Sequence, residues 1–301
     1  MKYSESTLKN WCLPASNTEE EKIDHAYHMI KDALSKSPEL QDLDIEVFVQ
    51  GSYANNTNVR TTSDIDVCVM LKSTFFTHYP DGLTRKDYGF IDGSITYADY
   101  KNRILRAIQN KFGATNVTVG NKSLKVRSNS YHVDADVVVA FMLKDFFSIG
   151  SKNPNIYVEG IRFYATDGSQ VSNYPKEHLK NGIAKNNRTN YEYKKLVRIF
   201  KRIRNCMVED NVVDGNIISS FLVECLIWQV PDRIITSYSS WSETVKRTIV
   251  YLYNEIINQN HQEWGEVSER LYLFRGRKWT DTDARKFLEK AWDYLGYANN
   301  E

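Results

Sequence analysis

A short alternation of acidic and apolar residues, placed after a Gly-Ser pair, limits what this chain can fold into. Gly51 and Ser52 follow the β-like run Val47 to Gln50, and a spacer of eleven residues separates them from Asp64. Successive residues of a strand point to opposite faces, so Asp64 and Asp66 project to one side, about 6.5 to 7 Å apart along the chain. The residues expected on the opposite, core-facing side are Ile65, Val67 and Val69.

Two carboxylates held side by side indicate a metal site, because they repel each other unless a cation lies between them. Mg²⁺ typically takes one or two carboxylates and completes its shell with substrate phosphates. We expect a third acid from the segment His132 to Phe141, where Asp134 and Asp136 share a face. Asp136 is favoured because it opens an apolar run typical of a central strand, although the choice against Asp134 stays open.

A set of three such acids favours nucleotidyl transfer. In a two-metal site, one ion activates an attacking hydroxyl and the other neutralises charge on the triphosphate and the leaving pyrophosphate. We therefore predict that Asp64, Asp66 and Asp136 are the catalytic residues and the metal ligands. The same reasoning predicts two Mg²⁺ per site, with Mn²⁺ as a substitute.

These residues resemble the DNA polymerase β-type nucleotidyltransferase superfamily, whose pattern is G-[GS], a spacer, [DE]-h-[DE]-h and a distant acid. A second block is similar to the bacterial CD-NTases (cGAS/DncV-like nucleotidyltransferases), particularly the CdnE-like group, and the likeness covers roughly residues 45 to 230. No Pro follows three residues after Asp136, where the family often has one. The second block comprises Gly160 to Phe163, Asn173 to His178, Asn181-Gly182, Lys185-Asn186 and Tyr193 to Asn205.

The resemblance implies an α+β fold. A polymerase β-like nucleotidyltransferase core, made of a mixed sheet with flanking helices, would be joined by a long spine helix to a C-terminal helical lobe. We place the core with its N-terminal helix at residues 1–190. The helical lobe, expected to complete the nucleotide pocket without an intervening linker, is placed at residues 191–301.

Several residues are candidates for binding nucleotide. Glycine lets a backbone approach phosphate closely, and a following hydroxyl and backbone N–H bind the anion, although a Gly-Ser pair alone marks only a turn. The resemblance places a phosphate-binding lysine on the spine helix, and later a phosphate-binding hydroxyl followed by an aromatic that stacks on the base. A helix cap and a core phenylalanine are the alternatives for that last pair. The candidates are Gln50, Gly51, Ser52, Lys201, Ser220 and Phe221, with Asn181 or Asn173 contacting a base through amides that donate and accept.

The spine helix is expected from about Asn190 to Val208, within a strongly basic stretch. Ten Lys or Arg residues against two Glu lie between Lys176 and Arg204, and we favour a phosphate-facing role for them over a solvated basic face. Lone histidines such as His78, His132 and His178 have no partner at ligand spacing, so surface or packing roles are favoured. The expected apolar stripe is Tyr193, Leu196, Val197, Phe200, Ile203 and Met207, flanked by Lys194, Arg198, Lys201 and Arg202.

Other elements follow from periodicity and turn residues. The opening residues are expected to be an arm, and residues 73–95 a long exposed insertion. Helices are predicted at Asn17 to about Lys36 and at Tyr97 to Phe112, with Gly113 as the stop. Strands are predicted near 44–50, 64–71 and 133–141, a hairpin near 160–174, and mainly helix from there on.

Composition excludes several classes of protein. A net charge of +1 gives no global field for nucleic acid, and 42% hydrophobic residues over 301 positions suffice for a substantial core. No run of about 18 apolar residues indicates a membrane span, so a cytoplasmic location is expected. The four cysteines are scattered without a Cys-x-x-Cys pair, which argues against zinc or a disulfide framework.

The resemblance finally implies a function. The chain would join nucleoside triphosphates into a cyclic di- or oligonucleotide second messenger with release of pyrophosphate. It would act in anti-phage defence of the CBASS type through an effector protein that binds the product, as a monomer and without obligatory nucleic acid. Three alternatives remain: a linear oligoadenylate or tRNA-end polymerase, an enzyme that modifies a protein or antibiotic, and a nucleotide-binding module without turnover.

Overall fold

The computed structural model describes residues 1–59, 64–129 and 132–298, and the chain divides into two compact units. Unit 1 comprises Met1–Pro14, Asn55–Arg60 and Glu177–Glu301, whereas unit 2 comprises Ala15–Ala54 and Thr61–Lys176. Unit 1 is therefore built from three separate stretches of sequence. The expected arm is wrong, because the first residues form helix α1 (Glu5–Trp11), which is capped by the Ser4 side chain and buries Leu8.

Unit 2 contains a mixed seven-stranded sheet within the described residues, with strand order β1-β2-β5-β4-β3 and with β6 and β7 continuing from β5. Only the β2–β5 pair is parallel among the described pairings. The strands are β1 (Ile45–Gln50), β2 (Ile65–His78), β3 (Val117–Val119), β4 (Leu124–Val126), β5 (Ala135–Asp145), β6 (Val158–Tyr164) and β7 (Gln170–Asn173).

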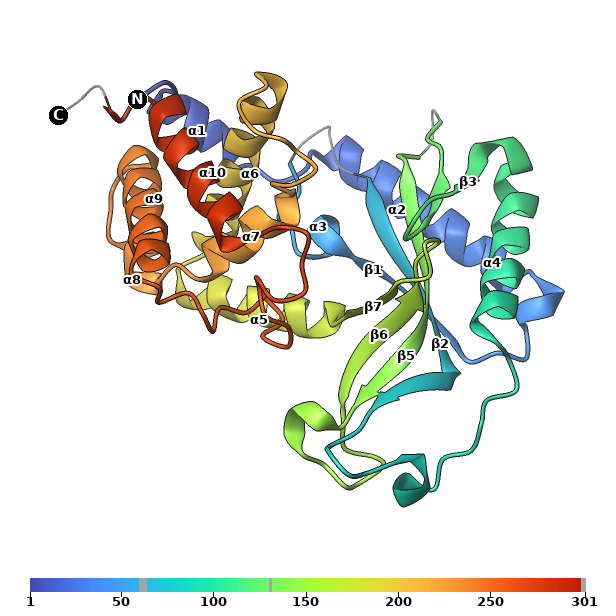
Figure 1. Cartoon of the computed structure of the whole chain (residues 1–301). Helices are drawn as coiled ribbons and strands as arrows, with labels where there is room; N and C mark the ends of the chain where they lie inside the picture. The colour runs from blue at the N-terminus through green and yellow to red at the C-terminus, as the bar shows by residue number, and fades with distance from the viewer. Residues whose placement is uncertain (60–63, 130–131, 299–301) are drawn as a thin grey trace. The chain divides into compact units, whose positions relative to one another are not determined.

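Helices α2 (Asn17–Ser35) and α4 (Tyr97–Phe112) cover one face of this sheet, as Figure 1 shows. Both agree with the predicted spans, and Gly113 ends α4 as expected. The short helix α3 (Gly51–Ala54) follows β1 directly. Single 3₁₀ turns lie at Pro38–Leu40, Arg85–Tyr88, Ala114–Asn116 and Phe147–Ile149.

The alternation along β2 is confirmed by its packing. Ile65, Val67 and Val69 are buried in the core shared with α2 and α4. Cys68 and Met70 face the other way and pack on residues of β5 and β6. Both faces of the strand are buried from Val67 to Leu71, as is usual for a strand paired in parallel inside a sheet. The acidic residue Asp66 near the beginning of β2 is therefore an exception that packing in the core does not explain.

The predicted insertion at residues 73–95 is wrong in its first part. Strand β2 continues to His78, with a register shift against β5 between Leu71 and Phe75. The polar residues Lys72, Ser73 and Thr74 at this shift made the strand look finished in the sequence. The predicted hairpin is confirmed, because β6 and β7 pair antiparallel around a turn in which Gly168 has φ +82°.

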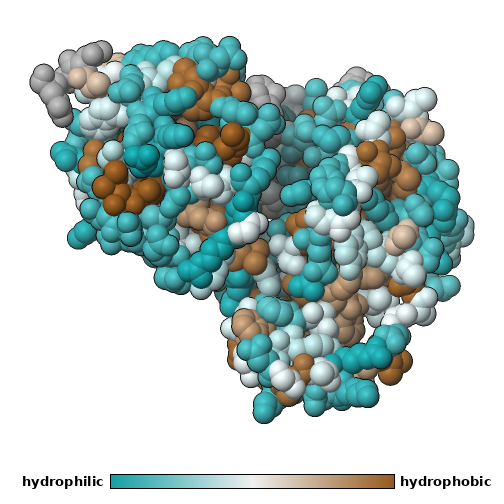
Figure 2. All heavy atoms as spheres, viewed as in Figure 1, coloured by the Kyte–Doolittle hydropathy of each residue, from teal (hydrophilic) through white to brown (hydrophobic). Residues whose placement is uncertain are grey.

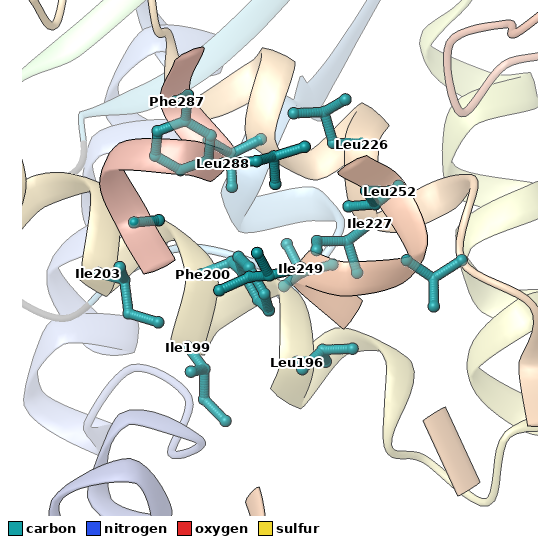
Figure 3. Packing of buried hydrophobic residues seen from close by; sticks show 14 of the residues in the cluster. Leu196, Ile199, Phe200, Ile203, Leu226, Ile227, Ile249, Leu252, Phe287 and Leu288 are labelled. Carbon is teal, nitrogen blue, oxygen red and sulfur yellow. The ribbon is translucent and has the colours of Figure 1, made fainter. Parts of the chain in front are cut away.

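Unit 1 is helical, and its core is shown in Figure 3. Phe200, from the long helix α6, packs among residues of α7, α9 and α10, and the whole predicted apolar stripe of α6 is buried. The helices after the sheet are α5 (Pro175–Arg188), α6 (Tyr193–Glu209), α7 (Ser220–Trp228), α8 (Asp232–Thr236), α9 (Trp241–Ile257) and α10 (Asp281–Tyr294). The predicted α+β organisation, a mixed sheet followed by helices, is confirmed.

The surface gives little further indication of where the protein is located. On the face drawn in Figure 2, apolar side chains form separate groups among hydrophilic ones. Among the described residues, none of the helices combines the length and the apolar character needed to span a bilayer.

Candidate active site

The predicted acids of unit 2 lie at one edge of the sheet, where β1 ends and β2 and β5 begin. Asp66 is the register partner of Asp136 in the parallel β2–β5 ladder, and of Gln50 in the antiparallel β1–β2 ladder. Neighbouring strands lie about 4.7 to 4.9 Å apart, so the backbone itself holds Asp66 beside Asp136. Asp64 comes one residue before β2, on the same side of the strand as Asp66.

Gly51 approaches the Asp66 carboxylate so closely that no side chain fits there. A Cβ at this position would lie 2.2 Å from Asp66 Oδ2, and the backbone has φ +69°, which L-residues rarely adopt. Glycine is thus required both by conformation and by the approach of the acid. Ser52 follows it in α3, and its hydroxyl has no hydrogen-bond partner in the described part of the chain.

The electrostatics of this edge show that the acids interact with each other. Partial burial, together with repulsion from Asp136 and then Asp134 and opposed by Lys125, raises the pKa of Asp64. Asp134 is exposed, and its Oδ1 accepts a hydrogen bond from the Ser128 backbone N–H at 2.5 Å. Asp136, which is ladder-paired with Asp66, is therefore the better placed third acid.

Lys125 is a cation that sequence reasoning did not single out. It lies on β4 opposite Asp136 in the register, with Nζ 4.0 Å from Asp136 Oδ1. Its side chain is more than half exposed, so it is free to turn away from this acid. The short strand β4 carries no motif that distinguishes this lysine, and only the ladder brings it to the site.

The donor chemistry of this edge fits a hard divalent cation. Three carboxylates are gathered with one neighbouring lysine, and the repulsion felt by Asp64 is relieved when a cation binds. Within residues 1–59, 64–129 and 132–298, no group of three or more acidic, His or Cys side chains is placed so that it could hold a metal ion. Mg²⁺ typically needs only one or two carboxylates beside water and substrate phosphates.

In unit 1, Lys201 is held in a buried charge network. Its side chain is 4% exposed, and Nζ donates to Glu224 Oε2 at 2.5 Å and to Thr57 Oγ1 at 3.2 Å. Thr57 also donates its hydroxyl to Glu224 Oε2, at 2.9 Å. A direct contact with phosphate would pull Lys201 away from Glu224 and leave a buried charge without a partner. This arrangement therefore argues against the predicted direct contact of Lys201 with phosphate.

Glu224 also binds His178, which sequence reasoning had treated as a lone histidine. His178 Nε2 donates to Glu224 Oε1 at 3.0 Å, and the His178 side chain is 12% exposed. Despite burial, the charge of Lys201 and the hydrogen bond from His178 hold the pKa of the Glu224 carboxyl well below its usual range. A signal was present in the sequence, because Glu224 is the only acid in the otherwise apolar α7 segment and has to find a partner inside.

The remaining predicted residues of unit 1 surround this network. Phe221 is partly buried against the helical core, and its ring centroid lies 6.0 Å from that of His178. Ser220 is exposed at the first position of α7, while the capping hydroxyl belongs to Ser219. Asn181, one turn after His178 on α5, donates Nδ2 to the Val267 carbonyl at 2.9 Å.

The expectation that the basic stretch faces phosphate is largely wrong. Most of its cations have partners inside their own unit, so little of the formal +8 is free. Lys185 donates to the carbonyls of Trp228 and Val230, and Arg198 to those of Cys12 and Asn56. Further paired members are Lys176 with Glu46 and Glu159, Lys180 with Glu177, Arg188 with Asp232, Lys195 with Glu192, and Arg204 with the carbonyls of Gly215 and Ile218.

The site and fold together define a class of protein. Acids presented on two parallel strands beside a Gly-Ser turn, within a mixed sheet, are the arrangement of a nucleotidyltransferase core. The model of the nucleotidyltransferase domain family matches residues 29–116. The model described as the cGAS/DncV-like nucleotidyltransferase C-terminal helical domain matches residues 180–296.

Comparison with known proteins is more specific. The chain is 42% identical to the cyclic dipyrimidine nucleotide synthase CdnE of Cecembia lonarensis, with 98% of this chain and 99% of that protein covered. It is 38% identical to the cyclic dipyrimidine nucleotide synthase CdnE of Legionella pneumophila, with 97% of each covered. The solved structure of the Elizabethkingia meningoseptica CdnE cyclic dinucleotide synthase with GTP and Apcpp is 33% identical. It has a TM-score of 0.82 and covers 98% of this chain and 100% of that one.

This chain belongs to the CdnE-like group of the cGAS/DncV-like nucleotidyltransferases. The resemblance drawn from Gly51-Ser52, the paired acids and the later block is therefore confirmed. The polymerase β-type nucleotidyltransferase core with a C-terminal helical domain is confirmed as well. The chain is an enzyme of the nucleotidyltransferase type.

Proposed function

We propose that this enzyme joins two pyrimidine nucleoside triphosphates into a cyclic dinucleotide and releases two pyrophosphates. The sugar hydroxyl of one nucleotide attacks the α-phosphorus of the other, pyrophosphate leaves, and a second attack closes the ring. The parallel register that pairs Asp66 with Asp136 carries the proposal of nucleotidyl transfer. The choice of pyrimidines is supported by the names of the two relatives matched over nearly the whole chain.

Asp64, Asp66 and Asp136 are the proposed ligands of two Mg²⁺ ions, which Mn²⁺ can replace. When bound, these ions lower the pKa of the attacking hydroxyl and neutralise charge on the triphosphate. The chain's own residues position the reactants, which is the main catalytic contribution in phosphoryl transfer. The Gly51 backbone, the Ser52 hydroxyl and the Gln50 side chain are proposed to hold the phosphates near these acids.

In unit 1, Ser220, Phe221 and Asn181 are proposed to contact nucleotide. The exposed Ser220 is proposed to contact phosphate through its hydroxyl, and the partly buried Phe221 ring is proposed to stack on a base. Asn181 keeps its amide oxygen as an acceptor while Nδ2 is held by Val267. For Lys201 we propose an indirect role, because its ammonium is committed to Glu224.

The product is proposed to be a second messenger of anti-phage defence that activates an effector protein. We further propose a monomeric, cytoplasmic enzyme that requires no nucleic acid. These statements are supported by membership in the family. A screen of the purified chain with and without added RNA or DNA tests the independence from nucleic acid, and light scattering tests the monomeric state.

The first experiment is incubation with each radiolabelled nucleoside triphosphate, singly and in pairs, with Mg²⁺ or Mn²⁺, followed by phosphatase and product separation. Phosphatase-resistant products from UTP or CTP, absent for Asp66→Asn, are expected. A resistant product that contains only purines would refute the choice of bases. A phosphatase-sensitive ladder would indicate the linear polymerase, and consumption only with an added acceptor would indicate a modifying enzyme. Binding without turnover in every mixture would indicate that the chain is a nucleotide-binding module.

A further inference from the structure

His178 and Glu224 form a polar contact in unit 1 that the reaction described above does not use. This pair stands next to the proposed base-stacking ring of Phe221. The side chains of Glu224 and Lys201 are 5% and 4% exposed, whereas that of His178 is 12% exposed. His178 is therefore the member of the network nearest to solvent.

The hydrogen bonds fix which nitrogen of His178 is available. A carboxylate only accepts, so Nε2 carries the proton that it donates to Glu224 Oε1. In the neutral ring, Nδ1 is then an acceptor, because the bond made by one nitrogen sets the tautomer of the other. The described part of the chain offers Nδ1 no hydrogen-bond partner.

Glu224 cannot easily turn away from His178, since its other oxygen is held twice. Oε2 accepts from Lys201 Nζ at 2.5 Å and from the Thr57 hydroxyl at 2.9 Å. The lysine also cancels the negative charge of the carboxylate. What the network presents at its outer end is therefore an oriented imidazole. It is not a free cation.

The chemistry of this end suits a nucleobase rather than a phosphate. His178 presents an acceptor beside the ring of Phe221, and Asn181, one helical turn further on α5, keeps its amide oxygen as a second acceptor. Acceptors complement the N–H groups on base edges, and an aromatic ring supports the base by stacking. Anions would instead require donors, and the amide nitrogen of Asn181 is already engaged by the Val267 carbonyl.

We propose that His178 contacts the nucleobase, with Nδ1 accepting a hydrogen bond from a base N–H, and that Glu224 is the positioning residue that orients it. This inference rests on the proposed function. For a pyrimidine the N–H comes from N3 of uracil or from the amino group of cytosine. Lys201 acts through Glu224, as the charge that keeps the carboxylate in place.

The test is a binding measurement with methylated bases. Calorimetry with the full chain and non-hydrolysable α,β-imido UTP is compared with the N3-methyl analogue, and α,β-imido CTP with the N4,N4-dimethyl analogue. Loss of one hydrogen bond weakens binding by about tenfold, so the unmodified chain is expected to prefer at least one parent base by that factor. The comparison that shows the preference, with the uracil pair or with the cytosine pair, identifies the base.

His178→Phe is the key variant, because it keeps a planar ring but has no acceptor in place of Nδ1, whereas a glutamine would supply its amide oxygen. We expect the preference for the parent base to vanish in this variant. The double variant Lys201→Met with Glu224→Leu removes both buried charges together, which generally preserves folding. It is expected to lose the preference too, because His178 is no longer oriented. Thermal unfolding confirms that each variant is folded.

The outcomes separate this inference from the proposed function. An unchanged preference in His178→Phe, or no preference in the unmodified chain, overturns the contact. A preference that survives in the double variant overturns the positioning role of Glu224. If the unmodified chain makes no cyclic product in a parallel reaction, the proposed function fails, while the binding ratios still decide the role of His178.

Discussion

Replacing Gly51 by alanine should abolish activity while leaving the fold intact. The new Cβ would lie 2.2 Å from Asp66 Oδ2, and real Cβ contacts are essentially never below 3.0 Å. The carboxylate therefore has to move by at least about 0.8 Å or turn to another rotamer. Misplacing a catalytic group by about 1 Å can reduce the rate about 100-fold. The left-handed backbone adds only about 1 to 2 kcal/mol of strain to the folded state.

Gly168→Ala is a matched control for this experiment. Gly168 has φ +82°, but nothing lies within 4 Å of a Cβ built there. Both variants should lose similar amounts of unfolding free energy in urea, whereas only Gly51→Ala should lose product formation with labelled triphosphates. If Gly51→Ala made product at a rate close to that of Gly168→Ala, the steric argument for Gly51 and the role of Asp66 would both be refuted.

Three further predictions concern charged groups. Asp66→Asn should make no detectable product yet melt at the same or a higher temperature, because repulsion with Asp136 is removed; a lower melting temperature would contradict that repulsion. Glu224→Gln should lose about 3 to 5 kcal/mol of unfolding free energy near pH 7, since Lys201 stays buried and uncompensated. Because the pKa of Glu224 is lowered in the fold, its stabilisation is present above pH 4.5 and is lost on acidification, so urea titrations of the variant should be less acid-sensitive. Burial lowers the pKa of Lys185 to about 8 from 10.5, so unfolding free energy should rise between these pH values by up to about 3 kcal/mol, and Lys185→Met should abolish the rise.

The grouping of the acids at the edge of the sheet was predictable because it depends on local alternation and on one long-range pairing. Alternation placed Asp64 and Asp66 on one side, and the apolar run after Asp136 marked a second central strand. The parallel ladder then brings Asp66 and Asp136 together without any further information. The close approach of Gly51 to Asp66 was not predictable, since it depends on where the chain turns after β1.

The hydrogen-bonded network in unit 1 could not be predicted from local patterns in the sequence. Thr57, His178, Lys201 and Glu224 come from four separate segments, and only tertiary packing brings them together. Helical periodicity correctly placed the apolar stripe of α6, but it assigned Lys201 to a face that flanks the stripe. The structure buries this lysine because Glu224 neutralises it there. Charge counts along a sequence cannot show which cations have internal partners.

The three-part composition of unit 1 has a consequence for how the chain folds during synthesis. Helix α1 is synthesised before the other described elements, yet it packs on α6 and α9. The Lys2 backbone N–H donates to the Leu295 carbonyl at 2.6 Å, and Tyr3 is hydrogen-bonded to Tyr294, so the N-terminus lies beside α10 in Figure 1. Unit 2 can form as soon as Lys176 has been made. The apolar side of α1, in contrast, cannot be fully packed until α10 has been made. A domain fused in front of α1 should therefore slow the final folding step of the helical unit rather than that of the sheet in unit 2.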